Sequence, residues 1–281
     1  MASDSRLVVL LGDISVFGFR QAFSLYPDRI YNLGICEQAM TSLAAGLAKE
    51  GFIPLLHSIA PFVVERCFEQ LKVDFCYQRL PGNVVSVGGS YDYAALGCSH
   101  HCPGDVEILR SLPGMEIVVP GTPAEFDRLF RAAYADSHPT YFRLSESSNP
   151  QDCDVAFGRA SLVKQGRLAT VVAVGPMLRA ASAAVQDLDV TLLYYTTVTP
   201  FDGETLRQNC PSGKVALVEP FYSGTLARDI HTALGPRPVA LEAIGVPRRF
   251  LTDYGQAAQH DEAIGLTPEG IRERVRKLIH E

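Results

Sequence analysis

The sequence predicts an α/β protein of two doubly wound domains, each a mainly parallel sheet with helices on both faces. Short runs rich in β-branched and apolar residues alternate with segments of helical periodicity, which is the pattern of βαβ units. A polar, turn-rich stretch interrupts this alternation near the middle of the chain, and the pattern then starts again. A length of 281 residues also suits two domains of ordinary size.

The first half of the chain carries strand-like runs separated by helical segments. Thr122 and Pro123 supply an N-cap side chain and a first-turn proline for one of the helices. The expected helices cover residues 36–50, 61–73 and 124–135. The expected strands cover residues 7–11, 30–34, 53–56, 84–88, 116–119 and 140–144.

The second half repeats the alternation on a smaller scale. Segment 146–158 lacks periodicity, so we expect one domain at residues 1–148 and a second at residues 149–281. The expected strands cover residues 169–174, 190–195, 214–219 and 239–244. The expected helices cover residues 177–185, 203–208, 224–234 and 268–279, the last with Ile271, Val275 and Leu278 on one face.

Charge and cysteine content narrow the class of protein. A formal net charge of −6 without a basic stripe argues against nucleic-acid binding. No apolar run reaches the roughly 20 residues that span a bilayer, and the first residues lack the features of a signal peptide. Seven cysteines, an odd number scattered through apolar segments, indicate reduced thiols and a cytoplasmic location.

The most informative segment is residues 32–51, with the sequence NLGICEQAMTSLAAGLAKEG. A strand is expected to end at Gly34, so Glu37 falls in the first turn of a helix rich in alanine and glycine. An acid in this position is commonly structural, because its charge complements the helix macrodipole. From the residues alone, this ordinary interpretation is favoured.

The pattern G-I-x-E-Q followed by A-A-G-L-A resembles a segment of the transketolase and deoxyxylulose phosphate synthase family. The resemblance implies a thiamine-diphosphate pyrimidine-binding domain followed by a transketolase C-terminal domain. It also implies that Glu37 hydrogen-bonds N1′ of the cofactor's aminopyrimidine and stabilises the imino form, whose 4′-nitrogen removes the proton from C2. Such a role needs a carboxylate shielded from water, so that one proton is shared with the ring nitrogen.

Residues 55–71, LLHSIAPFVVERCFEQL, resemble the family segment in which an aromatic ring stacks on the aminopyrimidine. By this resemblance Phe62 is the stacking ring and Arg66 also belongs to the cofactor site. The triplet Phe68-Glu69-Gln70 follows as in the family. Without the resemblance, Phe62 would be interpreted as a core aromatic at a strand–helix junction.

Residues 97–100, Gly-Cys-Ser-His, resemble the Gly-Pro-Thr-His motif of transketolases, and His100 precedes Leu109 by the family spacing. The resemblance implies that His100 binds substrate oxygen atoms and helps to transfer protons, with the adjacent His101 as a second substrate contact. Cys98 and Cys102 bracket these histidines, which suggests a metal cluster. Four ligands within five residues is not a usual zinc spacing, so we predict buried thiols and no metal site in this chain.

Two further residues enter the substrate site by resemblance, although the chain departs from the family there. Transketolases that bind sugar phosphates usually carry a histidine-aspartate pair, where this chain has Tyr91-Asp92, and a later arginine, where it has Glu146. Arg143 better matches the arginine of deoxyxylulose phosphate synthases. Arg143 and Arg66 would hold an anion, or each would form an ion pair at a surface or interface. We therefore predict Asp92 and Arg143 in the substrate site and leave open whether the substrate is phosphorylated.

The diphosphate half of the cofactor site is missing from the sequence. The Gly-Asp-Gly…Asn pattern, whose oxygen atoms bind Mg²⁺ in the family, does not occur, and Gly12-Asp13 is only a faint echo of it. The resemblance covers essentially the whole chain but only the middle and C-terminal domains of a full-length transketolase. It therefore implies a partner of the transketolase N-terminal type, which holds the diphosphate and Mg²⁺, in a heterotetramer.

The second domain carries family features at its strand ends, in residues 174–176 (Val-Gly-Pro) and 218–220 (Val-Glu-Pro). In the family this domain is chiefly structural and contributes to assembly. Its polar residues His231, His260 and Asp261 are therefore expected to be solvated or to cap helices.

Together these features predict one subunit of a thiamine-diphosphate transketolase, which transfers a two-carbon ketol unit from a ketose to an aldehyde with its partner. A β-type subunit of a 2-oxo acid dehydrogenase or decarboxylating synthase would use the same cofactor, but the spacing of His100 favours a transketolase. A non-catalytic regulatory subunit is a third hypothesis, and the presence of Glu37, Phe62 and His100 argues against it. The sequence identifies neither the donor nor the acceptor.

Overall fold

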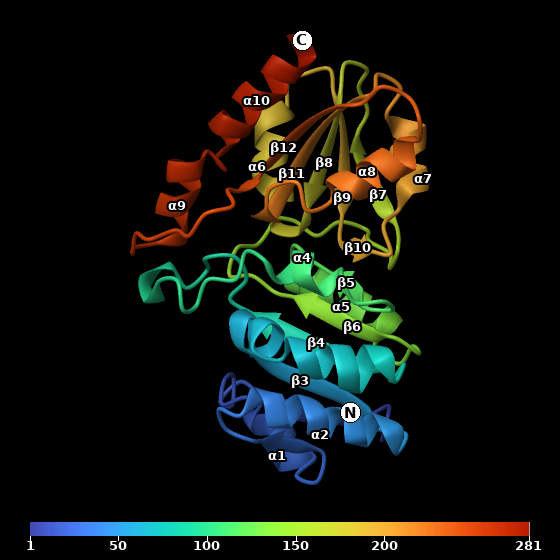
Figure 1. Ribbon diagram of the computed structural model, residues 1–281, viewed down its shortest axis with the longest axis vertical. Helices are drawn as coiled ribbons and strands as arrows, with labels where there is room; N and C mark the ends of the chain where they lie inside the picture. Colours follow the sequence, from blue (N-terminus) through green and yellow to red (C-terminus); the bar gives the residue numbers. More distant parts are fainter. Residues whose placement is uncertain (281) are drawn as a thin grey trace.

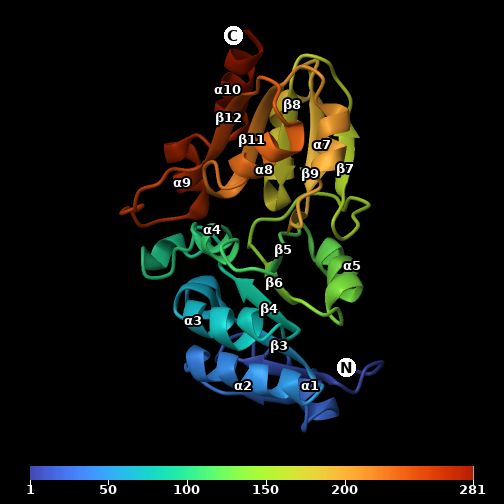
Figure 2. The same ribbon diagram turned by 45° about the vertical axis from the view of Figure 1, so that its right-hand side comes forward.

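Two β-sheets organise the chain, one in each half. In the computed structural model, which describes residues 1–280, the first sheet has seven strands in the order β10-β5-β6-β4-β3-β1-β2. The second has five strands in the order β12-β11-β8-β9-β7. Neighbouring strands pair in parallel except β10 with β5 and β7 with β9. Figures 1 and 2 show one sheet above the other with helices packed beside each, which confirms the predicted fold class.

The six strands that the first half contributes to this sheet agree with the predicted runs to within a few residues. The side chains of the inner strands are buried on both faces; Leu10 and Leu56, for example, are fully buried. Continuous apolar runs of this kind are typical of parallel strands covered on both sides. The strands from the first half are β1 (Leu7–Leu11), β2 (Ile30–Asn32), β3 (Ile53–Ile59), β4 (Gly82–Val87), β5 (Glu116–Val118) and β6 (Pro139–Arg143).

The helices of the first half include one segment that differs from its prediction. The segment expected as one helix at 61–73 forms two π-helical stretches with a short α-helical turn between them. Thr122 caps its helix as predicted, because its side chain accepts a hydrogen bond from the Glu125 amide. The helices are α1 (Arg20–Leu25), α2 (Glu37–Lys49), η1 (Pro61–Glu65), α3 (Phe68–Gln70), η2 (Leu71–Tyr77), η3 (Ala94–Leu96), α4 (Asp105–Leu109) and α5 (Pro123–Ala133).

Four of the five strands of the second sheet agree with the predicted runs, and β7 is an additional strand at its edge. The five strands are β7 (Ala160–Lys164), β8 (Thr170–Val174), β9 (Thr191–Tyr195), β11 (Lys214–Tyr222) and β12 (Ala240–Val246). The helices beside them are η4 (Gly175–Met177), α6 (Leu178–Val185), α7 (Gly203–Asn209), α8 (Ala227–Leu234), α9 (Ala257–Ile264) and α10 (Pro268–His280). The predicted apolar face of α10 is buried, as Ile271, Val275 and Leu278 show.

The two halves are joined by more than the chain connection. Strand β10 (Thr197–Thr199) leaves the second half and pairs with β5 at the edge of the first sheet. On the other side, Tyr91 donates a hydrogen bond to Asp261, and His260 is buried with a 5% exposed surface. The expectation that His260 and Asp261 are solvated or capping residues is therefore wrong, because both pack against the first half. His231 is exposed, as predicted.

Among residues 1–280, no helix combines the length and the apolar character that crossing a membrane requires.

Candidate active site

The carboxyl edge of the first sheet gathers the predicted cofactor residues. Strands β2, β3 and β4 run parallel within one sheet, so their carboxyl ends lie at the same edge. The connections that leave these ends carry Glu37, Phe62 and His100, respectively. Ligands of open α/β sheets bind at this edge, so the topology places the candidate site there.

Glu37 is a buried carboxylate at the first turn of α2, with only 1% of its surface exposed. Arg66 Nη1 donates to its Oε2 at 2.8 Å, and Ser58 Oγ donates to its Oε1 at 3.3 Å. The backbone at Gly12 also approaches closely, since a Cβ there would lie 2.9 Å from Ser58 Oγ and 3.5 Å from Glu37 Cγ. The carboxylate is therefore shielded from water and held in one orientation.

Arg66 connects Glu37 to the two predicted ring residues. Its guanidinium carbon lies 4.3 Å from the ring centroid of Phe62, in the geometry of a cation–π contact. The ring of His100 meets Phe62 edge-on with 5.2 Å between centroids. Ser99 Oγ lies 3.0 Å from His100 Nδ1. The structure thus brings Glu37, Arg66, Phe62 and His100 into one continuous cluster, which we call the Glu37 cluster.

Two residues of this site had no assigned role in the sequence. Gln38 Nε2 donates to the Arg66 carbonyl oxygen at 3.1 Å and thereby ties the start of α2 to the end of η1. Ser58 is fully buried beside the Glu37 carboxylate. Gln38 belongs to the G-I-x-E-Q pattern, which offered a signal, whereas a serine inside an apolar strand offered none.

Arg143 lies outside the Glu37 cluster, in the interior between the two halves. Its side chain is 1% exposed, and its Nε donates to Asp105 Oδ2 at 2.7 Å. Its Nη2 donates to Ser90 Oγ at 2.8 Å, and Tyr141 donates to the same Asp105 oxygen at 2.8 Å. Of the two alternatives weighed for Arg143, the structure shows a buried ion pair.

Asp92 lies near the carboxyl end of β6 rather than beside Glu37. Its carboxylate accepts hydrogen bonds from Ser145 Oγ at 2.9 Å and from the Glu146 amide at 3.0 Å. Burial raises the pKa of Asp92 to about 6, because desolvation disfavours the charged form more than these hydrogen bonds favour it. In this structure Asp92 therefore anchors the segment that follows β6.

His101 turns away from the Glu37 cluster and toward the second half. It is 7% exposed, and its ring meets that of His260 edge-on with 5.6 Å between centroids. Burial, followed by the neighbouring His260 and His100, lowers the pKa of His101. Because residues 100 and 101 diverge, one faces the Glu37 cluster and the other faces the contact between the halves.

The cysteines and histidines of residues 98–102 do not gather into a metal cluster within the described part of the chain. Cys98 is exposed, contrary to the expectation of a buried thiol, whereas Cys102 is buried and its Sγ donates to Glu65. The structure brings together a different group, Glu116, Asp136 and His138, whose ligand atoms lie within 4.8 Å of one another. This group sits where β5 and β6 begin, at the sheet edge opposite Glu37.

The Glu37 cluster suits one half of the predicted cofactor. A carboxylate has lone pairs beyond those used by Arg66 and Ser58, so it can also share a proton with a ring nitrogen. Phe62 supplies an aromatic face beside it. Within residues 1–280, the group of three His, Cys, Asp or Glu side chains close enough to share a metal ion lies at the opposite edge of the sheet. The residues at this edge therefore fit the pyrimidine half of the cofactor.

Comparison with known proteins supports a family assignment. Residues 1–151 match the family described as "Transketolase, pyrimidine binding domain". A protein of Rhodococcoides fascians, described as an uncharacterized 33.6 kDa protein in the fasciation locus, is 36% identical over 99% of this chain and 91% of its own length. A 6-deoxy-6-sulfo-D-fructose transketolase subunit of a Clostridium species is 32% identical, over 95% of this chain and 87% of its own.

Further relatives cover the same length. An apulose-4-phosphate transketolase subunit of Phocaeicola vulgatus is 28% identical, over 96% of this chain and 88% of its own. A solved structure described as a split gene transketolase, inactive beta4 tetramer, superposes with a TM-score of 0.87 at 27% identity, and covers 99% of this chain and 93% of that chain. The chain therefore belongs to the transketolase pyrimidine-binding domain family.

Proposed function

We propose that this chain is the pyrimidine-binding subunit of a split transketolase, which transfers a two-carbon ketol unit from a ketose to an aldehyde. The observation that carries the proposal is the buried Glu37 carboxylate. It accepts a hydrogen bond from Arg66, which in turn contacts the ring of Phe62, and His100 lies next to that ring. Relatives of similar length are named as transketolase subunits, which supports the same assignment. We propose a division of the chain into a pyrimidine-binding domain at residues 1–148 and a C-terminal domain at residues 149–281.

Family membership implies thiamine diphosphate as the cofactor, and this chain would hold its pyrimidine. Bound thiamine diphosphate supplies a carbon nucleophile for attack on a ketose carbonyl. Glu37 would hold a proton at N1′ of the pyrimidine, while its burial keeps water from competing for that proton. Arg66 and Ser58 would orient the carboxylate, and Phe62 would stack on the pyrimidine through the face that Arg66 leaves uncovered.

His100 is the residue proposed to act on the substrate. It lies at the rim of the Glu37 cluster, half-buried, where it can bind substrate oxygen atoms and move a proton at them. We also propose that His101 and Asp92, which lie in turns near His100, contact the substrate. Arg143 would act through its hydrogen bond to Ser90 rather than by direct contact, since its own side chain is buried.

A partner subunit of the transketolase N-terminal type would supply the diphosphate site and most Mg²⁺ contacts. Exposed apolar side chains on and around α2 and η2 support such a partner, because patches of this kind commonly mark interfaces. Four of them are 41–82% exposed: Ile35, Leu43, Val73 and Tyr77. We propose that the partner covers this surface and that the assembly is a heterotetramer with the active sites at the subunit interfaces.

The test is made on the complex with the N-terminal-type companion. Glu37→Gln keeps the size of the side chain but cannot hold the proton at N1′, so exchange of the cofactor C2 proton and ketol transfer should fall by about 10²–10⁴. Glu50→Gln, at the other end of α2, is the matched control and should leave both unchanged. Exchange at the wild-type rate in Glu37→Gln would contradict the assignment.

The same complex distinguishes the alternatives. A transketolase turns over a ketose or ketose phosphate, whereas a subunit of a 2-oxo acid dehydrogenase turns over pyruvate. A complex that binds no thiamine diphosphate would support the non-catalytic hypothesis instead. The isolated chain should turn over neither substrate.

A further inference from the structure

The loop that carries His100 is closed at its base. The backbones of Ser90 and Cys102 exchange two hydrogen bonds, at 3.3 and 2.7 Å, so residues 90–102 form one closed loop. We call this segment the His100 loop. Within it, the His100 amide donates to the Gly97 carbonyl oxygen at 2.9 Å. The position of His100 therefore depends on the turn at Gly97.

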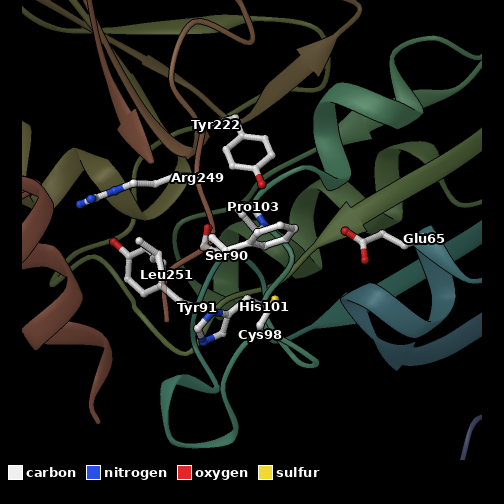
Figure 3. Close-up of a pocket in the computed structure, with 10 residues that line it drawn as sticks. Glu65, Ser90, Tyr91, Cys98, His101, Pro103, Tyr222, Arg249 and Leu251 are labelled. Atoms are coloured by element: carbon white, nitrogen blue, oxygen red, sulfur yellow. The ribbon is translucent and has the colours of Figure 1, made fainter. Parts of the chain in front are cut away.

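The second half of the chain holds the base of the His100 loop. Ser90 Oγ donates to the carbonyl oxygen of Pro220 in β11. The amide of Tyr222, also in β11, donates to the Pro103 carbonyl oxygen at 2.9 Å. Figure 3 shows Tyr222, Pro103 and Ser90 close together, where the end of β11 meets the loop. The base of the loop is thus fixed by hydrogen bonds that cross between the halves.

A connecting segment of the second half reaches the other end of the His100 loop. Residues 247–256 join β12 to α9. Arg248 donates to both carboxylate oxygens of Glu107 in α4, at 2.8 and 2.5 Å, and this bidentate pair fixes the segment to the first half. Residues 249–251 line one pocket together with Cys98, so the segment faces the loop beside Gly97.

Tyr254 of this segment packs on the bare backbone of Gly97. A Cβ atom at Gly97 would lie only 2.7 Å from a ring carbon of Tyr254, so a larger residue would displace the ring. Gly97 has a φ of 71°, a conformation that also favours glycine. Tyr254 is 73% exposed, so it contributes little to the core of either half and can be replaced without a large loss of stability.

We propose that Tyr254 is a positioning residue for His100: its ring holds the turn at Gly97 in place and so orients the histidine toward the substrate. This inference rests on the proposed function, in which His100 binds substrate oxygen atoms. Holding the end of a loop in place before the substrate binds lowers the entropy cost of a productive complex. Phe62 contacts the ring of His100 itself, whereas Tyr254 acts through the backbone of the turn. The second half thus takes part in the reaction as well as in assembly.

The first measurement uses the isolated chain and does not depend on catalysis. Hydrogen–deuterium exchange with mass spectrometry reports the opening of the hydrogen bond between the His100 amide and Gly97. Tyr254→Ala should speed exchange in peptides that cover residues 94–101 about tenfold, whereas Tyr254→Phe keeps the ring and should exchange as the wild type does. The matched control is Leu168→Ala, which removes an exposed apolar side chain just before β8, at the end of the second sheet remote from the His100 loop.

The second measurement uses the complex with the N-terminal-type companion. Tyr254→Ala should lower kcat/KM for ketol transfer about tenfold or more, because His100 is then misplaced when the substrate binds. Exchange of the cofactor C2 proton needs no substrate, so it should stay at the wild-type rate, which a general loss of structure would not allow. Tyr254→Phe should transfer the ketol unit as the wild type does.

Wild-type exchange of residues 94–101 in Tyr254→Ala would overturn the proposal, as would an unchanged kcat/KM of this variant in an active complex. Equal losses in Tyr254→Ala and Tyr254→Phe would also overturn it, because the ring would then not be what holds the turn. An inactive wild-type complex would instead refute the proposed function, and the exchange measurement would still decide whether Tyr254 holds the turn.

Discussion

The buried pair of Arg143 and Asp105 allows a quantitative test of how the two halves are held together. Both side chains are almost fully buried, at 1% and 0% exposure, and their charged atoms are 2.7 Å apart. Arg143→Met removes the positive charge and leaves the Asp105 carboxylate with hydrogen bonds from Tyr141 and the Val106 amide only. An uncompensated buried charge is the expected consequence.

The magnitude follows from the cost of breaking a buried pair. Removing one partner costs about 3–5 kcal/mol, because the remaining charge stays desolvated. For a chain of this size a loss of 1 kcal/mol lowers the Tm by about 2–4 °C, so Arg143→Met should lower it by about 6–20 °C. The double variant Arg143→Met, Asp105→Asn removes both charges and should be less destabilised than the sum of the single variants by about 1–3 kcal/mol.

The assay is thermal and urea unfolding of the isolated chain, followed by circular dichroism, for the wild type and the three variants. Lys164→Met, whose amine bonds only to backbone carbonyls beside α6, controls for the loss of a cation elsewhere. If Arg143→Met unfolds at the wild-type temperature, or if the two single effects simply add, the pair does not stabilise the fold. A raised KM without loss of stability would instead indicate direct substrate binding by Arg143.

Two further predictions concern single groups. Since folding raises the pKa of Asp92 from 3.8 to about 6, the native state binds more protons than the unfolded state in that range, and stability should fall as pH rises from about 4 to 6. The unfolding free energies of the wild type and of Asp92→Asn, measured at several pH values, test this fall in stability, which should be absent in the variant. Parallel pH profiles for the two proteins would refute the prediction. Alkylation of the native chain with iodoacetamide, followed by mass spectrometry, should modify the exposed Cys36 and Cys98 before the buried Cys67 and Cys102, in which burial also raises the thiol pKa. Equal labelling rates would contradict the burial.

The elements that could be predicted from the sequence are those with a clear local pattern of apolar residues. The strands β1, β3 and β4 are continuous apolar runs, and α10 shows its buried face as a helical period. Strand β10 was missed because three residues are too few to show an alternating apolar pattern. They form a strand only because they pair with β5, which is far away in the sequence. Strand β7 was missed because it is an exposed edge strand within a polar stretch.

In the candidate site, too, some features could be predicted from the sequence and others could not. Glu37, Phe62 and His100 lie together because each follows a parallel strand, and parallel strands were predicted from the βαβ pattern. The direction of individual side chains was not implied. Arg143 turns inward to Asp105, and His101 faces His260, because contacts between the halves determine both orientations. Such contacts join residues far apart in sequence and leave no local periodicity.

If the proposed function holds, the geometry of Glu37 gives a physical reason why a second subunit is needed. The carboxylate itself is 1% exposed, but the Arg66 side chain that holds it is 41% exposed, so water screens their attraction in the isolated chain. A partner that covers Arg66 and the apolar side chains around α2 would remove this water and lower the local dielectric constant. The same ion pair would then hold the carboxylate more firmly at a pyrimidine nitrogen, since charges interact more strongly away from water. Assembly would thus complete both the diphosphate site and the electrostatic environment that Glu37 needs.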